Sequence, residues 1–339
     1  MTRWFLIAGV SGALLVAVRF PRILELLTTP APGTVLPAIG ALALPAAAFA
    51  GWYWSRRGHS STQDVWGRLI ASKSFLTGAG VVATLGLAAL LAPVLTSYNP
   101  NAQPDILGAA TLRPSWAHPF GTDFFSRDLL SRVLYGARWS LGIALVAVTL
   151  LVVVGTAAGI LAGWAGGIVD AVVMRIVDAG IAIPRILLLL VIAALWGNLN
   201  FFALATLLGL TGWFGLSRIV RAEVLSLKQR PFLHAARALG ISRRRMVTHH
   251  LLPNLAAPIT VTAALGVGNI VLTEASLSYL GVGAPPPDPG WGNIIRESTS
   301  IILSAPWIAF FPGVAIFLTV VGFSLIGDSL RSALNPQSR

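Results

Sequence analysis

The residues able to do chemistry are few, and their spacing assembles no catalytic or nucleotide-binding motif. The chain has no cysteine, which excludes disulfides, thiol catalysis and cysteine-ligated metals. Its two lysines, Lys73 and Lys228, lie outside any Gly-x-x-x-x-Gly-Lys-Ser/Thr loop, the motif that cradles ATP phosphates. The adjacent His249 and His250 would point about 100° apart on a helix and would not converge on one ion. We therefore predict that the chain is not an enzyme and binds no metal or cofactor itself.

A basic segment between residues 218 and 257 has the most informative local pattern. Pro231 suits the first turn of a helix and Gly240 suits its end, so one short helix is expected between them. Ser242 is expected to cap a second helix, which Pro253 is expected to end.

The first of these helices has a face that could meet another protein. Phe232, Ala236 and Leu239 share that face at helical spacing, and Ala235 and Ala238 are small. Three interpretations compete: a basic loop without a partner, a DNA-binding helix-turn-helix, and a docking element for a cytoplasmic protein. Flanking apolar spans and the lack of a third helix argue against DNA, so we expect no nucleic-acid partner.

Charged residues inside apolar stretches are costly in a membrane and are treated as functional candidates. Glu274 lies toward the outer end of such a stretch, where it would either line a pathway or vestibule or accept structural hydrogen bonds. Arg175 and Asp178 are three residues apart and are expected to form a structural ion pair. Arg185 is expected to find a partner in the interior.

The amino-acid composition of the chain indicates a membrane protein. Of 339 residues, 55% are hydrophobic and only 11% are charged, against about 25% charged in soluble domains. A span needs roughly 20 apolar residues, and long apolar runs without alternation favour helices. We expect an all-α polytopic membrane protein with spans near residues 4–18, 35–54, 75–95, 139–163, 168–197, 201–217, 258–283 and 306–327. Most lysines and arginines then fall on one side, which predicts that both termini are cytoplasmic.

Several motifs resemble those of one family. The run from Ala235 to Gly240, followed by Leu252-Pro253-Asn254, resembles the EAA loop of binding-protein-dependent ABC importer permeases. The resemblance extends over about residues 75–339, to the dipeptide/oligopeptide/nickel branch and its C-type subunits. It rests on His118-Pro119-Phe120-Gly121-Thr122-Asp123, Arg127-Asp128, Leu134-Tyr135-Gly136-Ala137-Arg138, Trp291-Gly292-Asn293 and Phe311-Pro312-Gly313.

The resemblance implies a fold and a set of partners. The fold would be the six-helix, MetI-like core of a type I ABC importer, with two extra N-terminal hydrophobic helices. Residues 1–74 would be an N-terminal extension, 75–138 the first core span and external loop, 139–330 the permease domain and 331–339 a cytoplasmic tail. Partners would be a second homologous permease subunit, two ABC ATPase subunits carrying ATP and Mg, and an extracytoplasmic solute-binding protein, in a bacterial cytoplasmic membrane.

The same resemblance assigns the basic helix to ATPase coupling. The coupling residues would be Phe232, Leu233, His234, Ala235, Ala236, Arg237, Ala238, Leu239 and Gly240. The cargo would be a di- or oligopeptide, with nickel or another small solute as the alternative. A secondary transporter or channel working alone is the rival class, but the paired mid-membrane ionisable residues and inverted repeats it predicts are not found.

Two departures from the family pattern stand out. His234 occupies a position where the family usually has Glu, which puts one expected charged contact to the ATPase in doubt. Phe124-Phe125-Ser126 replaces a usual acidic-Leu-Gly sequence and alters an external surface.

Overall fold

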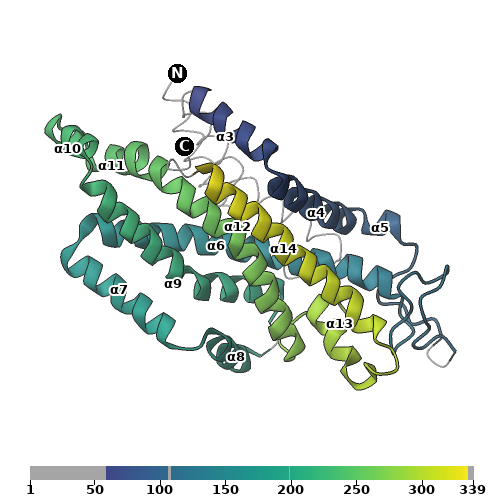
Figure 1. Cartoon of the computed structure of the whole chain (residues 1–339). Coiled ribbons are helices and arrows are strands. Elements are labelled where there is room, and N and C mark those ends of the chain that lie inside the picture. Colours follow the sequence, from purple (N-terminus) through teal and green to yellow (C-terminus); the bar gives the residue numbers. More distant parts are fainter. Residues whose placement is uncertain (1–58, 106–107, 198, 335–339) are drawn as a thin grey trace, which may run out of the picture.

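A computed structural model describes residues 59–105, 108–197 and 199–334, and every long element in that part of the chain is helical. The two expected spans at 4–18 and 35–54 lie outside the described residues. Figure 1 shows an elongated bundle of long, roughly parallel helices. The helices are α3 (His59–Ala71), α4 (Lys73–Leu90), α5 (Ala92–Leu95), α6 (Leu129–Ala165), α7 (Gly167–Ala182), α8 (Arg185–Trp196), α9 (Phe201–Lys228), α10 (Pro231–Ala238), α11 (Arg243–Met246), the π-helical η1 (Val247–Leu251), α12 (Leu252–Tyr279), α13 (Trp291–Ser298), the 3₁₀ η2 (Thr299–Ile301) and α14 (Trp307–Leu334).

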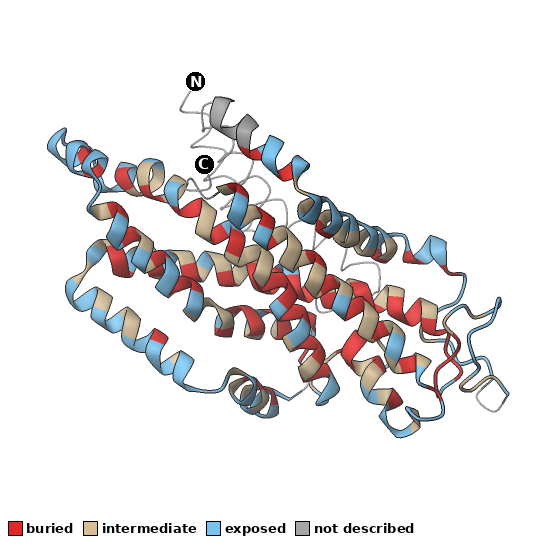
Figure 2. Ribbon diagram, in the orientation of Figure 1, coloured by how far each residue is buried: buried red, intermediate tan, exposed pale blue. Residues whose placement is uncertain are grey.

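The length and apolar character of the helices confirm an all-α membrane fold. Five described helical stretches are long and apolar enough to cross a membrane, and a sixth span results if α7 and α8 are counted together. The core forms where α6 packs against α9, and where α12 packs against α14 and α6 (Figure 2). Large apolar side chains of α7 and α8 remain exposed on this single chain, such as Ile168 and Leu195. Exposed apolar surface on this scale indicates contact with lipid or another subunit.

Close packing of α6 on α9 depends on three glycines of α6. Gly155, Gly159 and Gly163 are spaced four residues apart, so they lie on one face of the helix. A Cβ at Gly159 would lie 2.6 Å from the Cβ of Val220 and 2.7 Å from the carbonyl oxygen of Ser217. The absence of side chains there lets the two backbones approach, as in other membrane helix pairs.

The expected span at 168–197 is not one continuous helix, because the chain breaks within it. α7 and α8 meet at Ile183 and Pro184 with a bend of 89°. Ile183 has an extended backbone, at φ −87° and ψ 128°. The proline ring disfavours a helical conformation for the residue before it, and its missing N–H removes a helical hydrogen bond.

Pro253 does not end a helix as expected from the sequence. It sits in the first turn of α12, and α11, η1 and α12 run on as one stretch, Arg243–Tyr279. The π-helical turn before Pro253 widens the backbone, so a residue without an N–H is accommodated without stopping the helix.

Candidate functional site

Helix α10 projects at one end of the bundle, beyond the end of α9 (Figure 1). Pro231 is at its first turn and Leu239 caps it, which confirms the boundaries predicted from the sequence. Gly240 follows with φ +70°, a left-handed conformation that glycine adopts at no steric cost. The N–H of Ile241 then donates to the Ala236 carbonyl at 3.1 Å and closes the turn.

Of the three residues predicted to share a contact face for another protein, Phe232 and Leu239 are exposed, whereas Ala236 is buried. Leu233 is completely buried and Ala236 is 5% exposed, in contact with the rest of the chain. Phe232 and Leu239 instead point outward, at 42% and 80% exposure. Ala236 therefore belongs to the inner face. The burial of Leu233 against the bundle determines which side of this two-turn helix faces inward. Apolar side chains this exposed at the end of a helix indicate a surface available to another protein.

Two cations, Arg237 of α10 and Lys228 at the end of α9, contact the end of α6, and the sequence did not predict these contacts. Arg237 places its guanidinium carbon 5.4 Å from the centre of the Trp164 ring. Lys228 donates to the carbonyl oxygens of Gly163 and Trp164, at 3.0 and 3.2 Å. Because α10 also joins α9 at Lys228–Pro231 and α11 at Gly240–Ser242, a force on α10 reaches α6, α9 and α12 together.

Glu274 lies in the packed interior and not on a pathway or vestibule surface. Its side chain is completely buried on α12. The hydroxyls of Ser140 and Ser278 donate to its two carboxylate oxygens, at 2.9 and 2.7 Å. Glu274 thus links α12 to α6, which corresponds to the hydrogen-bonding alternative raised from the sequence, with partners inside this chain.

The expected pair between Arg175 and Asp178 is replaced by a pair between different helices. Arg218 on α9 donates to Asp178 on α7, with 2.5 Å between Nη2 and Oδ1. A second bridge, between Arg221 and Asp170, joins the same two helices. A pair three apart on one helix could not attach α7 to the bundle, whereas these two bridges do.

Arg185 points inward, in agreement with the expectation of an interior partner. Its Nη2 donates to the Leu208 carbonyl of α9 at 2.8 Å. A Cβ at Gly212 would lie 3.0 Å from that same nitrogen, so the glycine makes room for the guanidinium.

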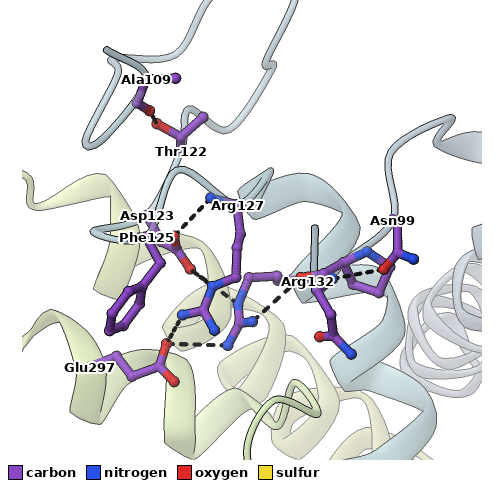
Figure 3. A network of polar contacts seen from close by, with 10 residues as sticks. Asn99, Ala109, Thr122, Asp123, Phe125, Arg127, Arg132 and Glu297 are labelled. Carbon is purple, nitrogen blue, oxygen red and sulfur yellow. Dashed lines mark hydrogen bonds and ion pairs between the residues drawn. The ribbon is translucent and has the colours of Figure 1, made fainter. Parts of the chain in front are cut away.

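A network of charges at the opposite end of the bundle also went unrecognised from the sequence (Figure 3). Arg127 bridges Asp123 at 2.6 Å and Glu297 at 2.5 Å, and Arg132 lies 3.3 and 3.2 Å from the same two acids. Two positive and two negative groups therefore compensate one another where water is largely excluded. The network ties the loop before α6 to α13, so its role is to hold this end of the bundle together.

The departure at Phe124-Phe125-Ser126 adjoins this network. Phe124 and Phe125 are 52% and 38% exposed, and the Arg127 guanidinium lies 4.7 Å from the Phe125 ring centre. Ser126 has φ +60°, and its hydroxyl is buried without a hydrogen-bond partner. A residue with a Cβ is strained in that conformation.

In the described part of the chain, no group of three or more His, Asp or Glu side chains is arranged to hold a metal ion. What the residues do form is a helical bundle with several apolar spans and a small amphipathic helix standing out at one end. This combination defines a multi-pass membrane protein.

Comparison with known proteins identifies the family. The model of the binding-protein-dependent transport system inner membrane component matches residues 155–339, and that of the N-terminal TM domain of oligopeptide transport permease C matches residues 60–114. The dipeptide transport system permease protein DppC of Alkalihalophilus pseudofirmus is 40% identical over 83% of this chain and 91% of its own length. Putative peptide transport system permease proteins of Brucella suis and Brucella abortus are each 40% identical over 80% of this chain and 90% of theirs.

The chain therefore belongs to the family of binding-protein-dependent transport system inner membrane components, with a MetI-like fold. Its relatives are named as permeases of peptide transport systems, and the family is the one that the sequence motifs resemble.

Proposed function

We propose that the chain is one of two permease subunits of an ATP-driven importer of di- or oligopeptides in a bacterial cytoplasmic membrane. In this proposal it forms half of the translocation pathway with a homologous but different permease subunit. An extracytoplasmic solute-binding protein delivers the peptide, and two ABC ATPase subunits bind ATP and Mg. Peptide cargo is supported by the names of the relatives.

The observation that carries the proposal is how α10 packs on the bundle and which of its side chains remain exposed. Its outer face offers Phe232 and Leu239 to a partner, whereas Leu233 is buried against the bundle. Arg237 of α10 and Lys228, the last residue of α9, both contact the end of α6. Movement of an ATPase bound to α10 would therefore rotate the core helices as a unit, which is the rigid-body mode of an alternating-access transporter.

Charge supports the orientation that this mechanism requires. The end of the bundle with α10 carries Arg230, Arg243, Arg244 and Arg245 on exposed positions. Basic residues are retained on the cytoplasmic side of membrane proteins. The α10 end then faces the ATPases, the α13 end faces the solute-binding protein, and both termini are cytoplasmic.

Co-purification tests the proposal. The tagged chain is expressed with the permease and ATPase subunits encoded beside it, extracted in mild detergent and assayed for bound ATPase and for peptide-stimulated hydrolysis. Phe232→Asp places a charge in the docking surface, and Gly240→Pro is incompatible with the positive φ after α10. Both should lose ATPase, whereas Phe124→Asp, at an exposed phenylalanine of the opposite end, should retain it. Unchanged assembly and hydrolysis in both α10 variants would refute the docking role.

A further inference from the structure

The outward face of α10 combines apolar side chains with positive charge. Phe232 and Leu239 supply the apolar part. Arg230 and His234 are exposed beside them, and neither forms an ion pair with any residue that the structure describes. Neither arginine nor histidine can carry negative charge, so no position on this face presents negative charge.

The surrounding sequence adds no acid next to Arg230 and His234. Residues 224–273 contain neither Asp nor Glu. Glu223 precedes Arg230 by seven residues and lies on α9, which ends at Lys228 before the chain reaches Arg230. Asp170 and Asp178 are already paired with Arg221 and Arg218.

The neighbouring cations are committed to contacts within the chain. Lys228 donates to backbone carbonyls at the end of α6, and Arg237 stacks on Trp164. Arg230 and His234 are thus the polar groups of α10 left to meet a partner. Charged groups at an interface are matched by opposite charge, because an unmatched charge loses hydration without compensation.

We infer that the ATPase groove receiving α10 presents carboxylate side chains to Arg230 and His234, an inference that rests on the proposed coupling function. The apolar pair Phe232 and Leu239 anchors the helix, and the hydrogen-bond donors of Arg230 and His234 select the partner. An ATPase with a basic groove would be rejected by like-charge repulsion. The positions 230 and 234 are then determinants of which ATPase this permease accepts.

Zero-length cross-linking tests for the carboxylates directly. His234→Lys places an amine on the outer face of α10, and a carbodiimide joins an amine to a carboxylate only when the two are in contact. The matched control is Arg331→Lys, an exposed position near the end of α14. The expected result is an amide bond between Lys at 234 and an Asp or Glu of the ATPase, located by mass spectrometry, with none from position 331. If ATPase co-purifies with His234→Lys but no bond forms at 234, the carboxylate groove is refuted while the coupling function stands.

Charge reversal and salt give a second, independent measurement. ATPase is titrated onto the wild-type permease pair in nanodiscs, and onto the pair carrying Arg230→Glu and His234→Glu. Reversal should weaken binding by about tenfold at low salt, and wild-type affinity should fall as salt rises. Affinity independent of both reversal and salt would overturn the inference. So would an effect of reversal that appears only with anionic lipid in the nanodisc, because α10 would then be recognising the membrane surface.

Discussion

Alanine in place of Gly159 should loosen the packing of α6 against α9. The added methyl carbon would lie 2.6 Å from the Cβ of Val220 and 2.7 Å from the carbonyl oxygen of Ser217. Carbon atoms in contact prefer a separation of about 3.5–4.0 Å. The two helices must therefore move apart by about 1 Å, since a Cβ and a backbone oxygen cannot rotate away.

The cost follows from overpacking. Inserting a methyl group into a tight core destabilises by about 1–3 kcal/mol, and this contact lies at the severe end of that range. Alanine recovers up to about 1 kcal/mol through its better helix propensity. The net expectation is a loss of about 1–2 kcal/mol in the free energy of unfolding.

Gly215→Ala is the matched control, because Gly215 lies on α9 and a Cβ there would have no atom within 4 Å. That variant should be as stable as the wild type or slightly more stable. Reversible unfolding in mixed detergent micelles, followed by circular dichroism, gives both values. A Gly159→Ala protein as stable as Gly215→Ala would refute the close-packed arrangement of α6 and α9.

Substitutions at three further positions have defined outcomes in the same unfolding assay. Ser126→Gly should stabilise by about 1 kcal/mol because it relieves a positive φ, and a decrease in stability would contradict this. Glu274→Ala should destabilise by about 3 kcal/mol because it opens a cavity and leaves two serine hydroxyls without an acceptor, whereas Glu274→Gln should lose less; equal losses would show that the acceptor is unimportant. Asp178→Asn should change stability by less than about 1 kcal/mol because both partners of its bridge are half exposed, and a larger loss would assign the bridge a greater role.

Local rules predicted the features that depend on local chemistry. Pro231 and Gly240 delimit α10 as expected, because a proline at the first turn and a glycine after the last act within a few residues. The apolar runs likewise located the long helices. The face of α10 was mispredicted at Ala236, since the burial of Leu233 depends on the rest of the bundle.

Features that depend on distant residues could not be predicted from spacing. Arg218 is forty residues from Asp178, and its bridge requires α7 and α9 to lie side by side. Glu297 is separated from Arg127 by 170 residues. The sharp bend at Pro184 was overlooked because the apolar run continues through it, although proline itself indicated a break.

ATP-driven uptake in proteoliposomes tests directly whether α10 couples ATP hydrolysis on partner subunits to peptide import. The complete assembly of permease pair, ATPases and solute-binding protein is reconstituted, and accumulation of a labelled dipeptide is measured with wild-type chain and with Phe232→Asp. We expect uptake to require ATP and all subunits, and we expect Phe232→Asp to abolish it. Undiminished uptake by the variant, or accumulation by this chain reconstituted alone, would contradict these expectations.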